Sequence, residues 1–246
     1  MPFMPETLLP VLIFSVALLY AMVGHGGASG YLFIFTLFSI GSPELLSTHA
    51  LLMNLVVATS AWSLFRTVSR GSLKLACLFL VTSIPSAFLG ATLRLSAHSY
   101  QWLLSIALIA AAVRLWVSSV RPIGETKAPG LAVTLPTGAA VGVLSGMVGV
   151  GGGIFLSPLM ILFRWADLKT TAAVSALFIL INSSSGLAGR MLAGRLVIGA
   201  HLLPLLAAAA AGGLIGAHIG AKRIPAVWLA RALSLVLLIA PLKWIL

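Results

Sequence analysis

Two glycine-rich blocks interrupt the apolar stretches of this chain, and they offer the clearest chemistry in the sequence. The blocks read GHGGASG at 24–30 and GVGGG at 149–153. Adjacent glycines do not line one face of a helix; they favour backbone conformations that end it. The half-helix after such a break presents unpaired N–H groups and the positive end of its dipole, which can bind an oxyanion without a fixed cation. The backbone positions predicted to bind an anion are Gly24, Gly26, Gly27, Gly149, Gly151, Gly152 and Gly153.

His25 is the titratable side chain inside the first block, and Val150 stands at the matching place in the second. Because imidazole titrates near neutral pH, His25 is our candidate for proton coupling. The alternative is a hydrogen-bonded histidine that fills space between helices, and Val150 indicates that the position does not need to titrate. The sequence leaves both interpretations open.

Polar side chains in neighbouring apolar stretches are further candidates for substrate contacts. Hydroxyl, amide and imidazole groups can donate hydrogen bonds to an oxyanion, and they can equally join helices to one another. The candidates are Ser29, Thr48, His49, Ser175, Asn182 and Ser183. Neither glycine block is a nucleotide-binding motif, because the chain has no GxxxxGK and no strand precedes the glycines. We expect no catalytic residue, metal site or cofactor, since no converging acid–base or metal-binding set accompanies His25.

The composition indicates a membrane protein. Of the 246 residues, 60% are hydrophobic and 8% are charged, and several apolar stretches reach the ~20 residues that a bilayer-spanning helix needs. Backbone polar groups must be paired within such a stretch, and the period-2 alternation of a β-barrel is missing from them. We therefore predict an all-α polytopic protein of a bacterial cytoplasmic (inner) membrane.

The charges favour an anionic substrate. The net charge of +11 does not predict nucleic-acid binding, because the 15 Lys and Arg residues are scattered singly over predicted loops. Eleven fall on the predicted inner side, and the outer set is Arg94, Arg190, Arg195 and Lys243. The four acidic residues, Glu6, Glu44, Glu125 and Asp167, are expected in loops or at interfaces. Since a carboxylate inside the membrane usually marks a cation or proton path, its expected absence favours an anion.

The chain is predicted to contain a duplication. When the sequence is aligned with itself at an offset of 125, Met22–Gly27 matches Met147–Gly152 with five of six residues identical. An offset of 123 aligns Glu44 with Asp167. The halves are predicted at 1–117 and 131–246, joined by a connecting loop at 118–130. The apolar segments are 7–22, 28–40, 46–65, 73–93 and 99–117, then 131–148, 152–163, 170–188, 197–220 and 226–246.

In each half, only glycines separate the first two segments, and the second segment is too short to cross a bilayer. This pattern predicts a glycine-broken re-entrant helical hairpin followed by three transmembrane helices. Because the number of crossings per half is odd, the two halves become inverted repeats, as in many secondary transporters, with an anion site where the two breaks meet. The alternative role of glycine, close helix packing, is assigned to Gly212, Gly216 and Gly220.

The motifs "MVGVGGGIFLSPLMI" at 147–161, "MVGHGGASGYL" at 22–32 and "TTAAVSALFILINSSSG" at 170–186 carry a family resemblance. In these motifs the chain resembles the TauE/SafE family of sulfite and organosulfonate permeases. The resemblance implies transport of sulfur-containing or related organic anions, driven by the membrane potential or by protons. The first block departs from the family pattern at His25, Ala28 and Ser29 and has no proline matching Pro158, which leaves substrate and direction open.

We predict a secondary transporter for small sulfur oxyanions, such as sulfite or sulfonates, that works by alternating access at a site between the two blocks. A passive anion channel and a permease for carboxylate-type anions are the alternatives; a membrane-embedded enzyme is disfavoured. The expected partners are a small anionic substrate, the lipid bilayer and a coupling proton at His25, with no nucleic acid. Homo-oligomerisation stays open.

Overall fold

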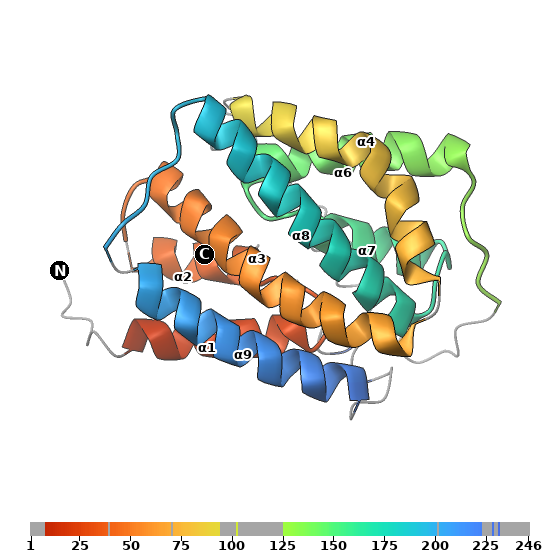
Figure 1. The fold of residues 1–246 in the computed structure, drawn as a ribbon, viewed down its shortest axis with the longest axis horizontal. Helices are drawn as coiled ribbons and strands as arrows, with labels where there is room; N and C mark the ends of the chain where they lie inside the picture. The colour runs from red at the N-terminus through yellow and green to blue at the C-terminus, as the bar shows by residue number, and fades with distance from the viewer. Residues whose placement is uncertain are drawn as a thin grey trace.

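The computed structural model describes residues 8–38, 40–69, 71–93, 102, 125–200, 202–222, 228 and 231. Within these ranges the chain forms α-helices and no strand, as predicted for an all-α protein (Figure 1). The helices are α1 (Leu8–Ala21), α2 (Ala28–Leu37), α3 (Pro43–Val68), α4 (Ser72–Thr92), α6 (Leu131–Val148), α7 (Gly153–Leu162), α8 (Leu168–Leu192) and α9 (Leu202–Lys222). Apart from Trp102, the predicted segment 99–117 lies outside the described residues, as do most of 118–130 and 226–246.

In the part of the chain that the structure describes, five helices are long and apolar enough to cross a membrane: α3, α4, α6, α8 and α9. By contrast, α2 and α7 have ten residues each, about 15 Å of helix, which is half the ~30 Å of a bilayer's hydrocarbon core. The prediction that these two helices are too short to cross is confirmed. Helix α6, predicted as one arm of a re-entrant hairpin, has 18 residues and reaches the length of a crossing helix.

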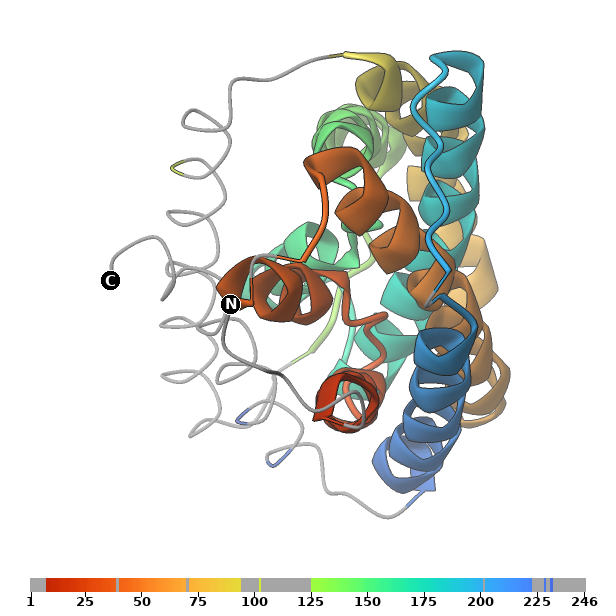
Figure 2. The ribbon, with the colours of Figure 1, turned by 90° about the vertical axis from the view of Figure 1, so that its left-hand side faces the viewer.

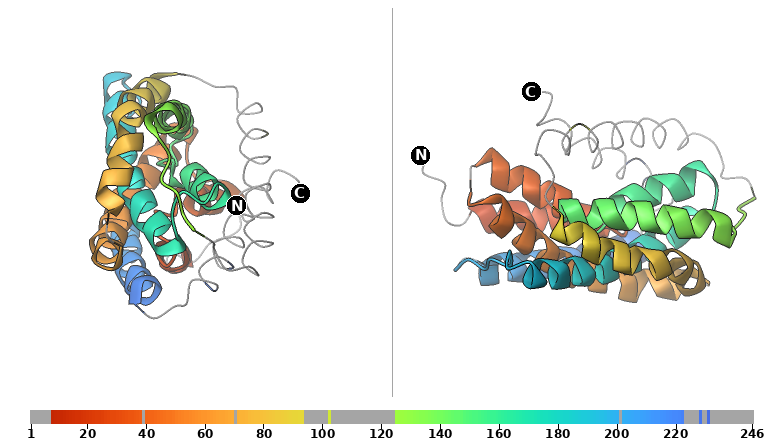
Figure 3. Two further views of the ribbon diagram at one scale, coloured as in Figure 1. Left: turned by 90° about the vertical axis from the view of Figure 1, so that its right-hand side faces the viewer. Right: turned by 90° about the horizontal axis from the view of Figure 1, so that it is seen from above.

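The helices form two layers. Helices α3, α4, α8 and α9 make one layer, and α1, α2, α6 and α7 lie on one side of it (Figures 2 and 3). In the first layer α3 and α8 run side by side in opposite directions (Figure 1). Two hydrogen bonds fix this direction: Ser69 after α3 donates to Thr170 in the first turn of α8, and Gly199 beyond α8 donates to His49 near the start of α3.

Side-chain caps set the starts of α3 and α8. The Ser42 hydroxyl accepts from the Leu45 N–H at 3.4 Å, and the Asp167 carboxylate accepts from the Lys169 and Thr170 N–H groups at 2.9 and 3.0 Å. The caps Ser42 and Asp167 are separated by 125 positions, as are the first residues of α2 and α7. The offset of 123, which pairs Glu44 with Asp167, is therefore wrong for the start of these helices.

The predicted segment 197–220 begins too early, because α9 starts at Leu202. Residues 195–199 have no helical structure. They are tied to α3 instead: the Gly199 N–H donates to His49 Nε2 at 3.1 Å, and the Val197 N–H donates to Thr48 Oγ1 at 3.5 Å. An apolar run can form a connector when side chains of another helix accept hydrogen bonds from its backbone.

Close helix packing rests on two ladders of glycines. A Cβ on Gly212, Gly216 or Gly220 of α9 would come within 3 Å of the backbone of α1 or of Met22 directly after it, so the predicted packing role of these three glycines is confirmed. A second ladder, which the sequence analysis does not single out, packs α6 on α4 in the same way and consists of Gly138, Gly142 and Gly146. In each pair of helices, glycines later in the sequence contact residues later in the partner segment. Helix α9 is therefore parallel to α1, and α6 is parallel to α4.

Candidate functional site

The two glycine blocks end helices, as predicted. The first break lies between α1 and α2 and turns at Gly24 and Gly27, which have φ angles of 79° and 97°. The second lies between α6 and α7 and turns at residues with φ angles of 78°, 76° and 79°, namely Gly149, Gly151 and Gly152. L-residues with a side chain rarely adopt such angles, so glycine is required for the backbone to leave the helix and restart within a few residues.

The breaks meet in the buried centre of the molecule. A Cβ on Gly26 or on Gly151 would come within 3.0 Å of the side chains of both Asn54 of α3 and Ile179 of α8. All residues of 23–30 and of 148–158 are buried. Two segments separated by 125 positions therefore face one another across the same two side chains.

Asn54 is a member of this site that the sequence analysis missed. Its Oδ1 accepts from the Ala28 N–H, the first N–H of α2, at 3.1 Å. Its Nδ2 donates to the Val150 carbonyl at 3.2 Å and to Ser183 Oγ at 3.4 Å. One fully buried carboxamide thus joins the first break to the second. The available signal was a carboxamide in the apolar middle of α3, since polar groups at membrane depth are energetically costly and often functional.

His25 connects the first break to the second half of the chain. The ring is 1% exposed, and its Nδ1 lies 3.1 Å from the Val23 carbonyl, which accepts only from an N–H. When the neutral ring carries its proton on Nδ1, its Nε2 accepts from the Ser157 hydroxyl of α7 at 3.2 Å; the Gly153 backbone is a further hydrogen-bond partner of the ring. Ser157 Oγ is in turn hydrogen-bonded to Ser175 Oγ of α8. The result is a buried chain of polar groups that crosses from one half to the other.

Of the remaining predicted site residues, some lie where the two breaks meet and others contact different parts of the molecule. Ser183 lies at the centre, beside Asn54 and Gly151. Ser29, in the first turn of α2, is hydrogen-bonded to the Tyr20 hydroxyl at 2.8 Å. Thr48 and His49 contact the connector before α9 instead of the breaks.

Asn182 points away from the breaks. Its Oδ1 accepts from Ser83 of α4, and its Nδ2 donates to the Phe178 carbonyl within α8 at 3.0 Å. Both hydrogen bonds are of the kind that joins or stabilises helices. In this conformation Asn182 therefore has a packing contact where a substrate contact was predicted.

Arg190 corrects the predicted distribution of charge. We predict it in an outer loop, but α8 continues to Leu192, and Arg190 is only 5% exposed within that helix. A Cβ on Gly149 would lie 3.1 Å from the Arg190 Nη2, so the guanidinium is beside the second break. The planar guanidinium binds oxyanions with two parallel hydrogen bonds, which makes Arg190 a further candidate for an anion contact.

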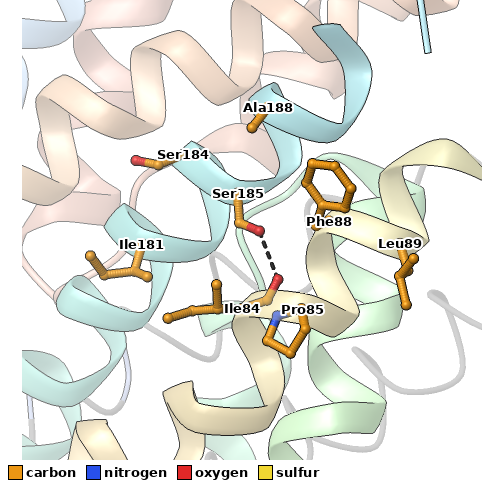
Figure 4. A pocket seen from close by; sticks show the side chains of 8 residues that line it. All are labelled: Ile84, Pro85, Phe88, Leu89, Ile181, Ser184, Ser185 and Ala188. Atoms are coloured by element: carbon orange, nitrogen blue, oxygen red, sulfur yellow. Dashed lines mark hydrogen bonds between the residues drawn. The ribbon is translucent and has the colours of Figure 1, made fainter. Parts of the chain in front are cut away.

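A groove of about 610 Å³ lies elsewhere, on an open face between α4 and α8. Figure 4 shows Ser185 pointing across it to the Ile84 carbonyl, to which its hydroxyl donates at 2.7 Å. The lining residues are Ile84, Pro85, Phe88, Leu89, Ile181, Ser184, Ser185 and Ala188. No charged side chain lines this groove, so it does not suit a small anion.

Comparison with known proteins decides the family. Residues 9–243 match the family model described as sulfite exporter TauE/SafE. The chain belongs to the TauE/SafE family. A relative, "Probable membrane transporter protein y4hK" of Sinorhizobium fredii (strain NBRC 101917 / NGR234), is 35% identical over 240 residues, covering 96% of each chain. No solved structure matches the chain.

Membership of TauE/SafE confirms the resemblance and makes this protein a membrane transporter; the family is not a family of enzymes. The five helices that can cross a bilayer agree with an integral membrane protein. Among the described residues, no cluster of three or more His, Cys, Asp or Glu could hold a metal ion.

Proposed function

We propose that this TauE/SafE transporter moves a small oxyanion, such as sulfite or a sulfonate, and binds it between the two glycine breaks. The observation that carries the proposal is that Gly26 and Gly151 face the same two buried side chains, Asn54 and Ile179. The half-helices α2 and α7 begin at this point, and their N-terminal N–H groups and dipoles favour an anion. The relative is named as a probable membrane transporter, and the family is described as that of a sulfite exporter.

The charges near the breaks support an anion over a cation. Arg190 supplies a buried positive charge beside the second break. The acidic residues that the structure describes, Glu44, Glu125 and Asp167, are not buried. A cation path through the membrane usually contains a carboxylate.

The packing supports two inverted repeats, 1–117 and 131–246. Gly24 packs on Ala172 of α8, and Gly149 packs on Ser47 of α3; both members of one contact lie 125 positions from those of the other. Because α3 and α8 are antiparallel, such reciprocal contacts are what a two-fold axis in the membrane plane would produce. Alternating access would follow from rocking of one repeat against the other.

The closed centre favours a carrier over a passive channel. A channel needs a continuous open path, whereas both breaks are buried here. We place the substrate in this occluded centre, and we assign to His25 the binding of a coupling proton. The relative's bacterial source supports a bacterial cytoplasmic membrane as the location.

A thermal-shift screen tests the class of substrate. Because a ligand that binds only the folded protein raises its stability, sulfite, thiosulfate, sulfoacetate or taurine should raise the melting temperature of the purified protein in detergent. Sodium chloride at equal ionic strength is the control. Stabilisation by acetate or succinate alone would favour the carboxylate alternative, and no shift with any anion would argue against the proposed site.

A further inference from the structure

The Asn54 carboxamide occupies the position that an anion at the first break would need. The N–H of Ala28 is the first of α2, and it already donates to Asn54 Oδ1 at 3.1 Å. An oxyanion and a carboxamide oxygen cannot both take this N–H in the same geometry. Binding of an anion to α2 therefore requires Asn54 to move.

The same side chain also holds the second break. Asn54 Nδ2 donates to the Val150 carbonyl, so moving the carboxamide releases both breaks together. The position that corresponds to Asn54 at an offset of 125 is Ile179, which contacts the same two glycines but cannot form hydrogen bonds. One polar side chain, without a polar counterpart in the other half, therefore controls both segments.

We propose that Asn54 is a latch that keeps the two breaks together in the empty transporter and is displaced by the arriving oxyanion. This positioning role rests on the proposed anion site. When Oδ1 leaves the Ala28 N–H, the substrate takes its place, and the freed NH2 group of Asn54 becomes a donor to that substrate. Release of the Val150 carbonyl in the same step couples binding to separation of the breaks.

Hydrogen–deuterium exchange on the whole protein in nanodiscs, without any anion beyond buffer chloride, tests the latch directly. In Asn54→Leu we expect faster exchange in peptides from both breaks, because a leucine side chain can form no hydrogen bond with either break. In Asn54→Asp the carboxylate still accepts from Ala28 but cannot donate to Val150, so exchange should rise at the second break alone. Ser83→Ala, which removes a buried hydrogen bond to Asn182, is the control and should leave both breaks unchanged.

A double variant and a binding measurement make the test independent of simple destabilisation. Adding Ile179→Asn to Asn54→Leu places an amide at the corresponding position and should restore slow exchange at both breaks. When sulfite binding is measured, Asn54→Asp should bind sulfite at least tenfold more weakly than the wild type, because the introduced carboxylate repels the anion. Unchanged exchange in both single variants would overturn the latch. If the wild type does not bind sulfite, the proposed anion site is contradicted. The exchange data would still test whether Asn54 holds the two breaks together.

Discussion

Gly151→Ala is expected to lower anion flux in proteoliposomes at least tenfold, whereas Gly71→Ala should leave the flux near that of the wild type. The two glycines have similar backbone angles, with φ of 76° and 80°, so alanine adds similar backbone strain at each, of order 1–2 kcal/mol. They differ in their surroundings. A Cβ on Gly71 would meet nothing within 4 Å, while one on Gly151 would lie 2.7 Å from Ser183 Oγ and 2.9 Å from Asn54 Nδ2.

The pair separates loss of the site from loss of the fold. Both variants should elute as single peaks in size-exclusion chromatography, with the lower melting temperature in Gly151→Ala because its Cβ also crowds neighbouring side chains. Flux should differ between them because only Gly151 borders the centre where the breaks meet. A folded Gly151→Ala protein with full flux would contradict the placement of the substrate between the breaks.

His25→Gln is expected to remove the pH dependence of transport. Protonating the neutral imidazole ends its ability to accept from Ser157 and adds a positive charge beside the proposed anion site. Uptake by the wild type should therefore increase as the pH is lowered into the range in which the buried imidazole takes up a proton. The glutamine variant should show a flat profile over the same range, measured as initial rates of uptake of a sulfonate, whose own charge is constant there.

The matched control for this experiment is His218→Gln, since His218 lies on the exposed side of α9. Its pH profile should follow that of the wild type. If folded His25→Gln retains the wild-type profile, the imidazole has no part in proton coupling. The hydrogen-bonded space-filling interpretation of His25 would then apply.

Much of the helical framework could be predicted from the sequence, because glycines and polar N-cap residues mark the ends of the helices. The segment predicted at 131–148 has the bounds of α6, which ends at the positive-φ residue Gly149. The start of α9 could not be predicted in this way. Residues 196–198 are as apolar as the segments that form helices. Their non-helical form depends on hydrogen bonds from the connector to Thr48 and His49, which are about 150 positions away in the sequence.

The backbone part of the candidate site could be predicted from the glycine blocks. The side-chain part could not, because the direction in which a side chain points depends on how the helices pack. Thr48 and Asn182 have suitable chemistry, but their hydrogen bonds go to the connector and to α4. Asn54 was missed because a single amide in an apolar run gives no periodic signal. Arg190 was missed because the predicted helix ended at 188, four residues before α8 ends.

Counterflow of radiolabelled sulfite in proteoliposomes tests the central claim most directly. Vesicles preloaded with unlabelled sulfite should accumulate external label transiently and with saturation, because a carrier with one alternating site exchanges substrate across the membrane. Gly151→Ala vesicles should show no such overshoot, and Gly71→Ala vesicles should show it. Sulfite uptake that is linear with concentration, shows no overshoot and carries current would contradict a carrier with its site between the breaks.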